Sequence, residues 1–287
     1  MIQIKNNKFN SLDDALNSIK DDTKETIIKI SNEYFKGQYT INKNNVTLDC
    51  INTIFTNNYG GYKIMEDGFK RGTFNTYTLF LNADNIKLKG LIIENTVGYD
   101  NVGQGIALMS NSDNLLVEDC IIDGYQDTLF LAPLPLQEFE KGGFKGPLQD
   151  SKRLIKNSIF RSCTIKGSVD FIFGGGNALF EDCLIISMNI NKTGYICAPS
   201  TNKDDIGFVF KNCKFTHEHC KPNTIYLARP WREYGKTKFL NCFFDKHINE
   251  EGYYDWNRDI TKPTFIEEKC YGPGSKKDKR VSWSKQV

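Results

Sequence analysis

The chain has 287 residues, and its 37 Lys and Arg nearly balance its 35 Asp and Glu, leaving a formal net charge of +2. This balance argues against a nucleic-acid partner, and no run of about 18 apolar residues is present that would cross a membrane. The nine cysteines are odd in number and form no CxxC pair, so neither a zinc site nor a complete disulfide framework is predicted.

The N-terminal segment, residues 1–25, is predicted to form a helical cap. Its amphipathic stretch SLDDALNSIK is typical of a short helix that begins at Asn10 or Ser11. The first residues, MIQIKNNKFNS, lack the apolar core of a secretory signal. The sequence itself therefore predicts a cytoplasmic location.

Beyond this cap, short strand-like segments recur along the chain and indicate stacked repeats. Each segment alternates apolar and polar residues and then reaches a Cys or Gly, and no helical pattern separates the segments. We therefore predict a parallel β-helix whose cysteines form an internal ladder rather than disulfides; an ordinary sandwich is the alternative, but it would not explain the constant phase. The residues assigned to this phase are Cys50, Gly90, Cys120, Cys163, Cys183, Cys213 and Cys242.

Two aspartates share one position relative to this ladder. Asp127 lies seven residues after Cys120, and Asp170 lies seven residues after Cys163. If the two coils are neighbours, their backbones lie about 4.8 Å apart. The excess sequence between them is accounted for by an excursion rich in Pro and Gly, residues 131–153. We therefore expect the two carboxylates to face each other.

Asp170 stands within VDFIF, a run that otherwise reads as a strand buried on both faces. An unpaired carboxylate in such a place costs several kcal/mol, on the order of the usual penalty for a buried charge. Two stacked carboxylates in apolar surroundings separate in proton affinity, which suits general acid and base chemistry. The competing interpretation for either aspartate is a turn residue; for Asp123, which precedes a Gly, we adopt that interpretation.

Three motifs, in this order, resemble the signatures of the pectin methylesterases (pectinesterases): DGYQDTLF, GSVDFIFGG and LARPWREYGKT. FNSLDDALNSI and GYYDWN resemble the first and last parts of the same family, so the likeness covers residues 1–287 as one domain. The resemblance implies a right-handed parallel β-helix, all-β, with a short N-terminal helix and long loops that border a groove. It also implies hydrolysis of the methyl esters of galacturonate units in pectin, with release of methanol.

The resemblance assigns roles to individual residues. Asp170 matches the nucleophile, Asp127 the general acid/base, and Arg229 the arginine that pairs with the nucleophile. Gln104 and Gln126 match amides that stabilise the oxyanion, although they could instead belong to an internal amide ladder.

Three aromatic residues are expected to border the substrate. Trp231 and Phe173 match aromatic residues of the sugar subsites. Tyr195 is expected either to line the groove or to belong to the core. The resemblance implies no metal ion and no organic cofactor, and a monomer acting on methyl-esterified pectin or an oligogalacturonide. It also favours secretion, in conflict with the cytoplasmic expectation.

The sequence departs from the family pattern in places. Three glycines run together at residues 174–176, which is expected to loosen the turn after Asp170, and Ala228 replaces a glycine before Arg229. The excursion at residues 131–153 is long enough to wall the groove. Two other functions remain open: a polygalacturonase with paired aspartates, and a carbohydrate-binding or thioester-acting relative on the same scaffold.

Overall fold

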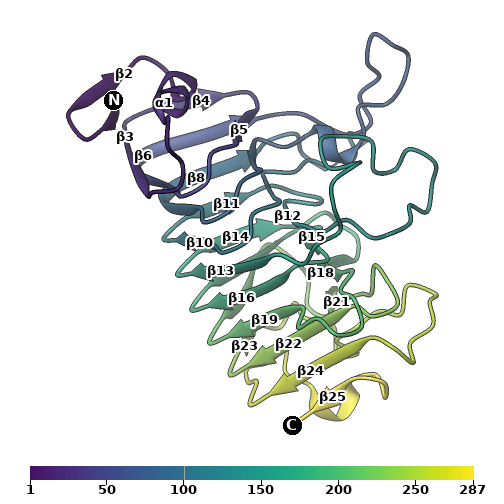
Figure 1. Ribbon diagram of the computed structural model, residues 1–287. Coiled ribbons are helices and arrows are strands. Elements are labelled where there is room, and N and C mark those ends of the chain that lie inside the picture. Colours follow the sequence, from purple (N-terminus) through teal and green to yellow (C-terminus); the bar gives the residue numbers. More distant parts are fainter. Residues whose placement is uncertain (100) are drawn as a thin grey trace.

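The computed structural model, which describes residues 1–99 and 101–287, is a right-handed parallel β-helix, as predicted (Figure 1). Successive coils stack in register from the N-terminal to the C-terminal end. One face is a seven-stranded parallel sheet, whose strands are β5 (Tyr39–Ile41), β7 (Leu79–Leu81), β9 (Leu108–Ser110), β12 (Leu129–Leu131), β15 (Val169–Gly174), β18 (Gly194–Pro199) and β21 (Ile225–Ala228).

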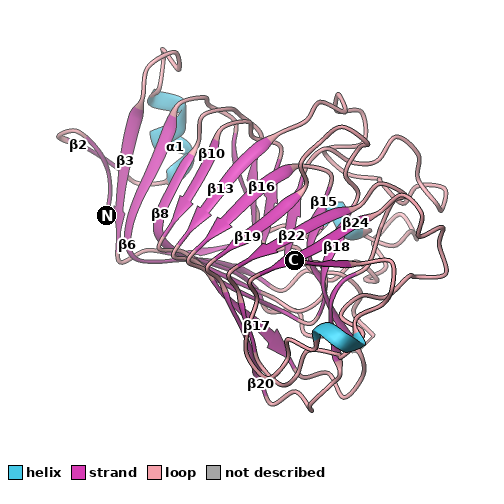
Figure 2. Cartoon of the chain, turned by 90° about the horizontal axis from the view of Figure 1, so that it is seen from below, coloured by secondary structure: helices cyan, strands magenta, loops and turns pink. Residues whose placement is uncertain are grey.

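The other two faces belong to one bent sheet, because β6 (Val46–Asn57) and β8 (Lys87–Asn95) run through both. Its first face contains β3 (Thr26–Ser31), β10 (Leu115–Glu118), β13 (Asn157–Arg161), β16 (Asn177–Glu181), β19 (Phe208–Lys211), β22 (Lys236–Leu240) and β24 (Thr264–Glu268), which lie side by side in Figure 2. The last strand of this face, β25 (Lys285–Gln286), pairs with β24. Its second face contains β4 (Tyr34–Lys36), β11 (Ile121–Asp123), β14 (Thr164–Gly167), β17 (Leu184–Met188), β20 (Lys214–Glu218) and β23 (Phe243–Phe244).

The N-terminal end is covered by α1 (Leu12–Ser18) and by β1 (Ile2–Ile4), which pairs antiparallel with β2 (Asn7–Phe9) and with β3. Ser11 caps the helix, because its Oγ accepts a hydrogen bond from the backbone N–H of Asp14 at 3.0 Å. The helix buries Leu12, Ala15 and Leu16 against the first coil. Nowhere in residues 1–99 or 101–287 is there a helix with the length and apolar character to cross a membrane.

A ladder of cysteine thiols runs through the interior, and all nine cysteines are free and buried. From Cys163 onward, the thiol of each rung approaches a backbone carbonyl of the preceding coil; the distance from Cys163 Sγ to the oxygen of Val117 is 3.4 Å. The same contact recurs along the stack and extends to Cys270, which the sequence analysis missed. The thiols thus serve as small core side chains that carry a weak donor.

Two positions of the predicted ladder are wrong. Strand pairing aligns Ile92 with Ile121, so Leu91 stands opposite Cys120, and Gly90, with φ +70°, occupies the preceding left-handed turn. Because β6 carries extra residues between Asp49 and Thr53, Thr53 pairs with Leu91, and Cys50 lies earlier in the strand. Glycine readily adopts the left-handed conformation of this turn. The sequence pattern therefore assigned the ladder position to Gly90 instead of to Leu91, one residue later.

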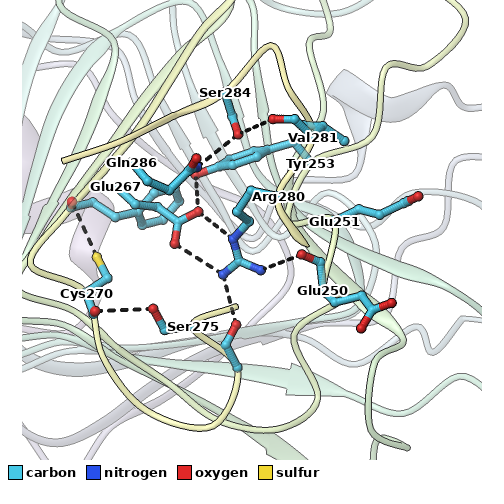
Figure 3. A network of polar contacts seen from close by, with 12 residues as sticks. Glu250, Glu251, Tyr253, Glu267, Cys270, Ser275, Arg280, Val281, Ser284 and Gln286 are labelled. Carbon is cyan, nitrogen blue, oxygen red and sulfur yellow. Dashed lines mark hydrogen bonds and ion pairs between the residues drawn. The ribbon is translucent and has the colours of Figure 1, made fainter. Parts of the chain in front are cut away.

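The C-terminal segment is fastened to the last coil by a buried ion pair (Figure 3). The Arg280 guanidinium donates to both oxygens of Glu267, at 2.7 and 3.1 Å, and the two side chains are 0% and 1% exposed. The Tyr253 hydroxyl donates to Glu267 as well, at 3.2 Å. Arg280 Nη2 also donates to the backbone oxygen of Gly274 at 2.9 Å, and Nη1 donates to those of Asn249 and Glu250, each at 3.0 Å. This network joins the tail, which contains the 3₁₀ turn η2 (Lys277–Lys279), to β24.

Glu267→Gln is expected to lower the free energy of unfolding by about 3–5 kcal/mol, because it leaves the Arg280 charge buried without a counter-ion. Glu268→Gln, on the same strand, is the matched control: it breaks only the exposed pair with Lys238 at 3.2 Å and should cost less than about 1 kcal/mol. Urea denaturation of the three proteins measures both values. Equal costs for the two variants would contradict the role assigned to the buried pair.

Candidate functional site

Asp127 and Asp170 occupy the same position on neighbouring coils. Gln126 pairs with Val169, and the backbone N–H of Asp127 donates to the Val169 oxygen at 3.0 Å. Both aspartates have left-handed backbones, with φ of 63° and 49°, a conformation that Asp adopts more readily than most residues. The pairing of β15 with β18 is irregular between Val169 and Ile172, and such irregularities re-aim side chains. The two carboxylates therefore face a cavity rather than the core.

Arg229, directly after β21, holds Asp170 with two hydrogen bonds. Its Nε donates to Oδ1 at 2.8 Å, and a terminal nitrogen donates to Oδ2 at 2.6 Å. The guanidinium lies 3.7 Å from the centres of both the Tyr195 and the Trp256 rings. Such bidentate geometry, with aromatic rings on the guanidinium, fixes both charged groups in place. The buried carboxylate in the VDFIF strand is therefore paired.

Burial makes the two carboxyls hold their protons more tightly, but to different extents. Burial raises the pKa of Asp170, and the Arg229 guanidinium opposes that rise. Burial raises the pKa of Asp127 well above its usual range, and the neighbouring Asp170 charge raises it further. Arg229 and the Gln126 side chain offset this only in part. Of the pair, Asp127 therefore keeps its proton to higher pH, and Asp170 ionises first.

The two aspartates and Arg229 lie at a cavity of about 340 Å³, which Gln104 and Gln126 also line. The Gly105 N–H donates to the Gln126 oxygen at 3.0 Å, so the two glutamines belong to adjacent coils. The aromatic walls come from separate loops and strands and consist of Phe74, Phe139, Phe144, Phe173, Trp231 and Trp256.

The connection between β12 and β13, called the long loop (residues 132–156), supplies one wall through Phe139, Glu140, Gly143 and Phe144. It projects from the same side of the solenoid as the hairpin around residue 65 (Figure 1).

The prediction that the three glycines at residues 174–176 loosen the turn after Asp170 is wrong. A Cβ on Gly174 would come within 2.0 Å of the Leu131 oxygen, so these glycines pack tightly against the start of the long loop.

The structure brings together most of the residues named from the sequence. Asp127, Asp170, Arg229, Gln104 and Gln126 meet at the cavity.

Among the aromatic residues the result is mixed. Trp231 and Phe173 line the cavity and contact each other, with ring centroids 5.7 Å apart. Tyr195 is outside the cavity lining and packs on Arg229, stacked in turn on Tyr226. The sequence analysis missed Trp256, although GYYDWN, which contains it, had been noted as a family segment.

No group of three or more His, Cys, Asp or Glu side chains among the described residues is arranged to hold a metal ion. The charged residues that line the cavity are Asp127, Asp170, Glu140, Arg229 and Arg232. Carboxylates, amides and a guanidinium held by Asp170 meet at this cavity. A carboxylate nucleophile beside a second, proton-holding carboxyl suits acyl transfer.

Comparison with known proteins gives consistent similarities. The Pectinesterase family model matches residues 2–141 and 143–287. A pectinesterase from Petunia integrifolia is 30% identical, with 96% of this chain and 71% of the relative covered. The probable pectinesterase/pectinesterase inhibitor 23 of Arabidopsis thaliana is 29% identical over 96% of this chain but only 47% of its own length. The solved structure of a pectin methylesterase from Yersinia enterocolitica superimposes with a TM-score of 0.78 and 26% identity, covering 97% of this chain and 94% of that one.

Asp127→Asn is expected to stabilise the fold near neutral pH. Because the folded-state pKa is raised, ionising Asp127 costs folding free energy, about 1.4 kcal/mol for each tenfold gain in proton affinity on folding. Below the unfolded-state pKa, Asp127 is protonated in both the folded and the unfolded state, so the variant is no more stable than the wild type. As the pH rises from there through the raised folded-state pKa, the wild type loses stability relative to the variant.

Thermal melts of both proteins at pH 4 and pH 8 check this. Asp182→Asn, at an exposed position with φ of 54°, controls for the same substitution in the same backbone conformation. A stability difference for Asp127→Asn that does not grow with pH would rule the explanation out.

Proposed function

The chain belongs to the pectinesterase family, and from this premise we propose that Asp170 and Asp127 carry out its ester hydrolysis on methyl-esterified galacturonate units of pectin. The protein is a carboxylic ester hydrolase that removes these methyl esters, a reaction of cell wall modification. The observation that supports the residue assignment is the arrangement of the two carboxyls. One is held by Arg229 through two hydrogen bonds, and the other retains its proton on the adjacent coil.

In the first half of the reaction, the ionised Asp170 attacks the ester carbonyl carbon. The tetrahedral intermediate expels the methoxy group, which takes the Asp127 proton and leaves as methanol. An acyl-enzyme anhydride with Asp170 remains. Arg229 keeps the attacking carboxylate ionised and fixed, since a guanidinium stays charged across the physiological pH range.

In the second half, Asp127 is now ionised and acts as a base. It takes a proton from a water molecule, which attacks the acyl carbon of the anhydride. The bond to Asp170 breaks, the product leaves as a galacturonate carboxylic acid that ionises, and both aspartates return to their starting states. The aromatic walls limit water around the anhydride, which strengthens the electrostatic contacts inside the cavity.

In this proposal, Gln104 and Gln126 stabilise the oxyanion. Both line the cavity beside the aspartates, and an amide N–H can donate to the oxygen that becomes negative in the intermediate. In this proposal Trp231 and Phe173 border the sugar ring, and Trp256, which lines the same cavity, is assigned the same role. Tyr195 serves the reaction through Arg229, because its ring packs on the guanidinium.

Asp170→Asn is expected to abolish methanol release from methyl-esterified pectin, because the amide cannot attack the ester. Asp182→Asn, outside the cavity and with a similar φ, should retain wild-type methanol release. Measuring reducing ends in the same samples tests the polygalacturonase alternative, for which methanol would stay at background while reducing ends rise. Methanol release by Asp170→Asn at the wild-type rate would exclude Asp170 as nucleophile.

Gln126→Ala is expected to lower kcat for methanol release about 100- to 1,000-fold and to change KM little, because the lost donor acts mainly on the transition state. Steady-state kinetics on one pectin preparation measures both constants. If the variant raised only KM, Gln126 would instead bind the ground-state substrate.

A further inference from the structure

Two of the three histidines of the chain lie against each other. His217 is on β20, and His247 follows β23. Their ring centroids are 4.9 Å apart, and the ring planes are inclined by 43°. The third histidine, His219, is exposed. The ester hydrolysis proposed above uses neither ring of the pair.

His247 is buried without a polar partner. It is 0% exposed, and neither of its ring nitrogens has a hydrogen-bond partner among the described residues. On β17, Ser187 stands opposite His217 in the strand pairing, and its buried Oγ lacks a partner as well. An imidazolium in such a place would carry a charge and two N–H donors without an acceptor. The packed His247 is therefore favoured in its neutral form.

The titratable groups around His247 do not offset this burial. His217 accepts a hydrogen bond at Nδ1 from the Cys220 N–H at 3.1 Å. Burial raises the pKa of the Cys220 thiol to about 11, so this group stays neutral. Asp245 Oδ2 lies 3.9 Å from His217 Nε2, and among the described residues no carboxylate lies within ion-pair distance of His247. The strand β21, of sequence IYLA, contributes no charge.

The direction of the pH effect follows from this burial. The pKa of His247 is lowered to about 4, first by burial and then by His217, whereas Asp245 opposes the shift. A His247 that is released into water recovers an ordinary pKa of about 6.5. The stability that the neutral, packed ring contributes is therefore complete above about pH 6.5 and is lost as the pH falls from there toward 4.

His247 belongs to a segment that pairs with β21, called the closing segment (residues 245–256). The His247 oxygen accepts hydrogen bonds from two N–H groups at the start of β21, at 2.9 and 3.0 Å. At the other end of this strand, the Tyr254 N–H donates to the oxygen of the last strand residue at 3.1 Å. The closing segment ends at Trp256, whose ring lies 3.7 Å from the Arg229 guanidinium. It therefore supports Arg229 both through β21 and through this ring.

We propose that the packed, neutral His247 holds the closing segment on β21, and that mild acid promotes release of this segment, which takes the Trp256 ring away from Arg229. Release places the His247 charge in water, where it is solvated. Arg280 also holds the middle of the segment through two backbone oxygens, so opening at neutral pH is rare. The other coils keep their own strand pairs, and the change is a local opening. The catalytic cavity thus responds to pH through a histidine that does not line it.

Hydrogen exchange followed by mass spectrometry tests this without substrate. Between pH 7 and pH 4.5, after correction for the intrinsic exchange rate, the opening constant of the closing segment should rise about 50-fold, as one histidine with these two pKa values predicts. The strand β10, within the stack of coils, is the internal reference and should open no more at pH 4.5 than at pH 7. Equal opening of the closing segment at both pH values would overturn the proposal.

Two variants separate His247 from other acid effects. His247→Phe keeps an aromatic ring and loses no hydrogen bond, because neither nitrogen of His247 has a partner. Its closing segment should open to the same extent at pH 7 and pH 4.5. His219→Gln removes the exposed histidine of the same region and should behave like the wild type. An acid-induced opening of wild-type size in His247→Phe would contradict the proposal.

The wild type alone provides a check that does not depend on how the variants fold. The chain has only three histidines, so NMR of their ring resonances can follow His247 directly. In the closed state its ring should remain neutral at pH 5.5. A His247 that takes up its proton near pH 6.5 while the closing segment stays protected from exchange would overturn the proposal. Because both measurements omit pectin, their outcome is independent of the proposed function.

Discussion

The bidentate contact between Arg229 and Asp170 is the interaction on which the site depends. Its members come from different coils: Asp170 from β15, Tyr195 from β18, and Arg229 from the end of β21. Trp256 adds a ring from the loop that follows. A buried ion pair offsets its desolvation cost only when its geometry is well defined. The register of the solenoid therefore sets the state of the nucleophile as well as the shape of the core.

The left-handed backbone conformation of Asp127 and Asp170 also occurs at other positions of the fold. Left-handed residues recur at one turn of the coils, at Asp119, Asp182 and Asn212 among others, directly before the ladder cysteines. At Asp127 and Asp170 the same conformation occurs within the seven-stranded face, where it turns a carboxylate out of the core. Backbone outliers of this kind are common at functional sites, because the surrounding structure must hold them in place. Here the flanking strand pairs supply that support.

The sequence predicted the regular part of the molecule well, because stacking imposes a period on the residues. The pairing of Asp127 with Asp170 followed from their equal distance to Cys120 and Cys163. The ladder failed at Cys50, where the extra residues of β6 shift the phase without changing composition, and at Gly90, which lies one residue before the ladder position in β8.

The loops around the site were less predictable. Trp256, Arg232 and Phe139 stand in segments without periodicity, and their convergence depends on how separate loops meet in space. Tyr195 shows the same limit within a strand, because alternation indicates that a side chain points outward but not what covers it. The pattern thus located the carboxylates, and the motif resemblance located Arg229. The aromatic and cationic surroundings required the structure.

Because its thiols form an internal ladder without disulfides, the stability of this fold does not depend on the redox conditions around it. All nine sulfur atoms are buried and uncrosslinked, so the solenoid needs no oxidant to become stable and offers no thiol at its surface to a reductant or an alkylating reagent. The number of cysteines therefore does not indicate where such a protein works. Chemical labelling of these sulfurs would occur only when neighbouring coils separate, which makes them built-in reporters of partial opening along the stack.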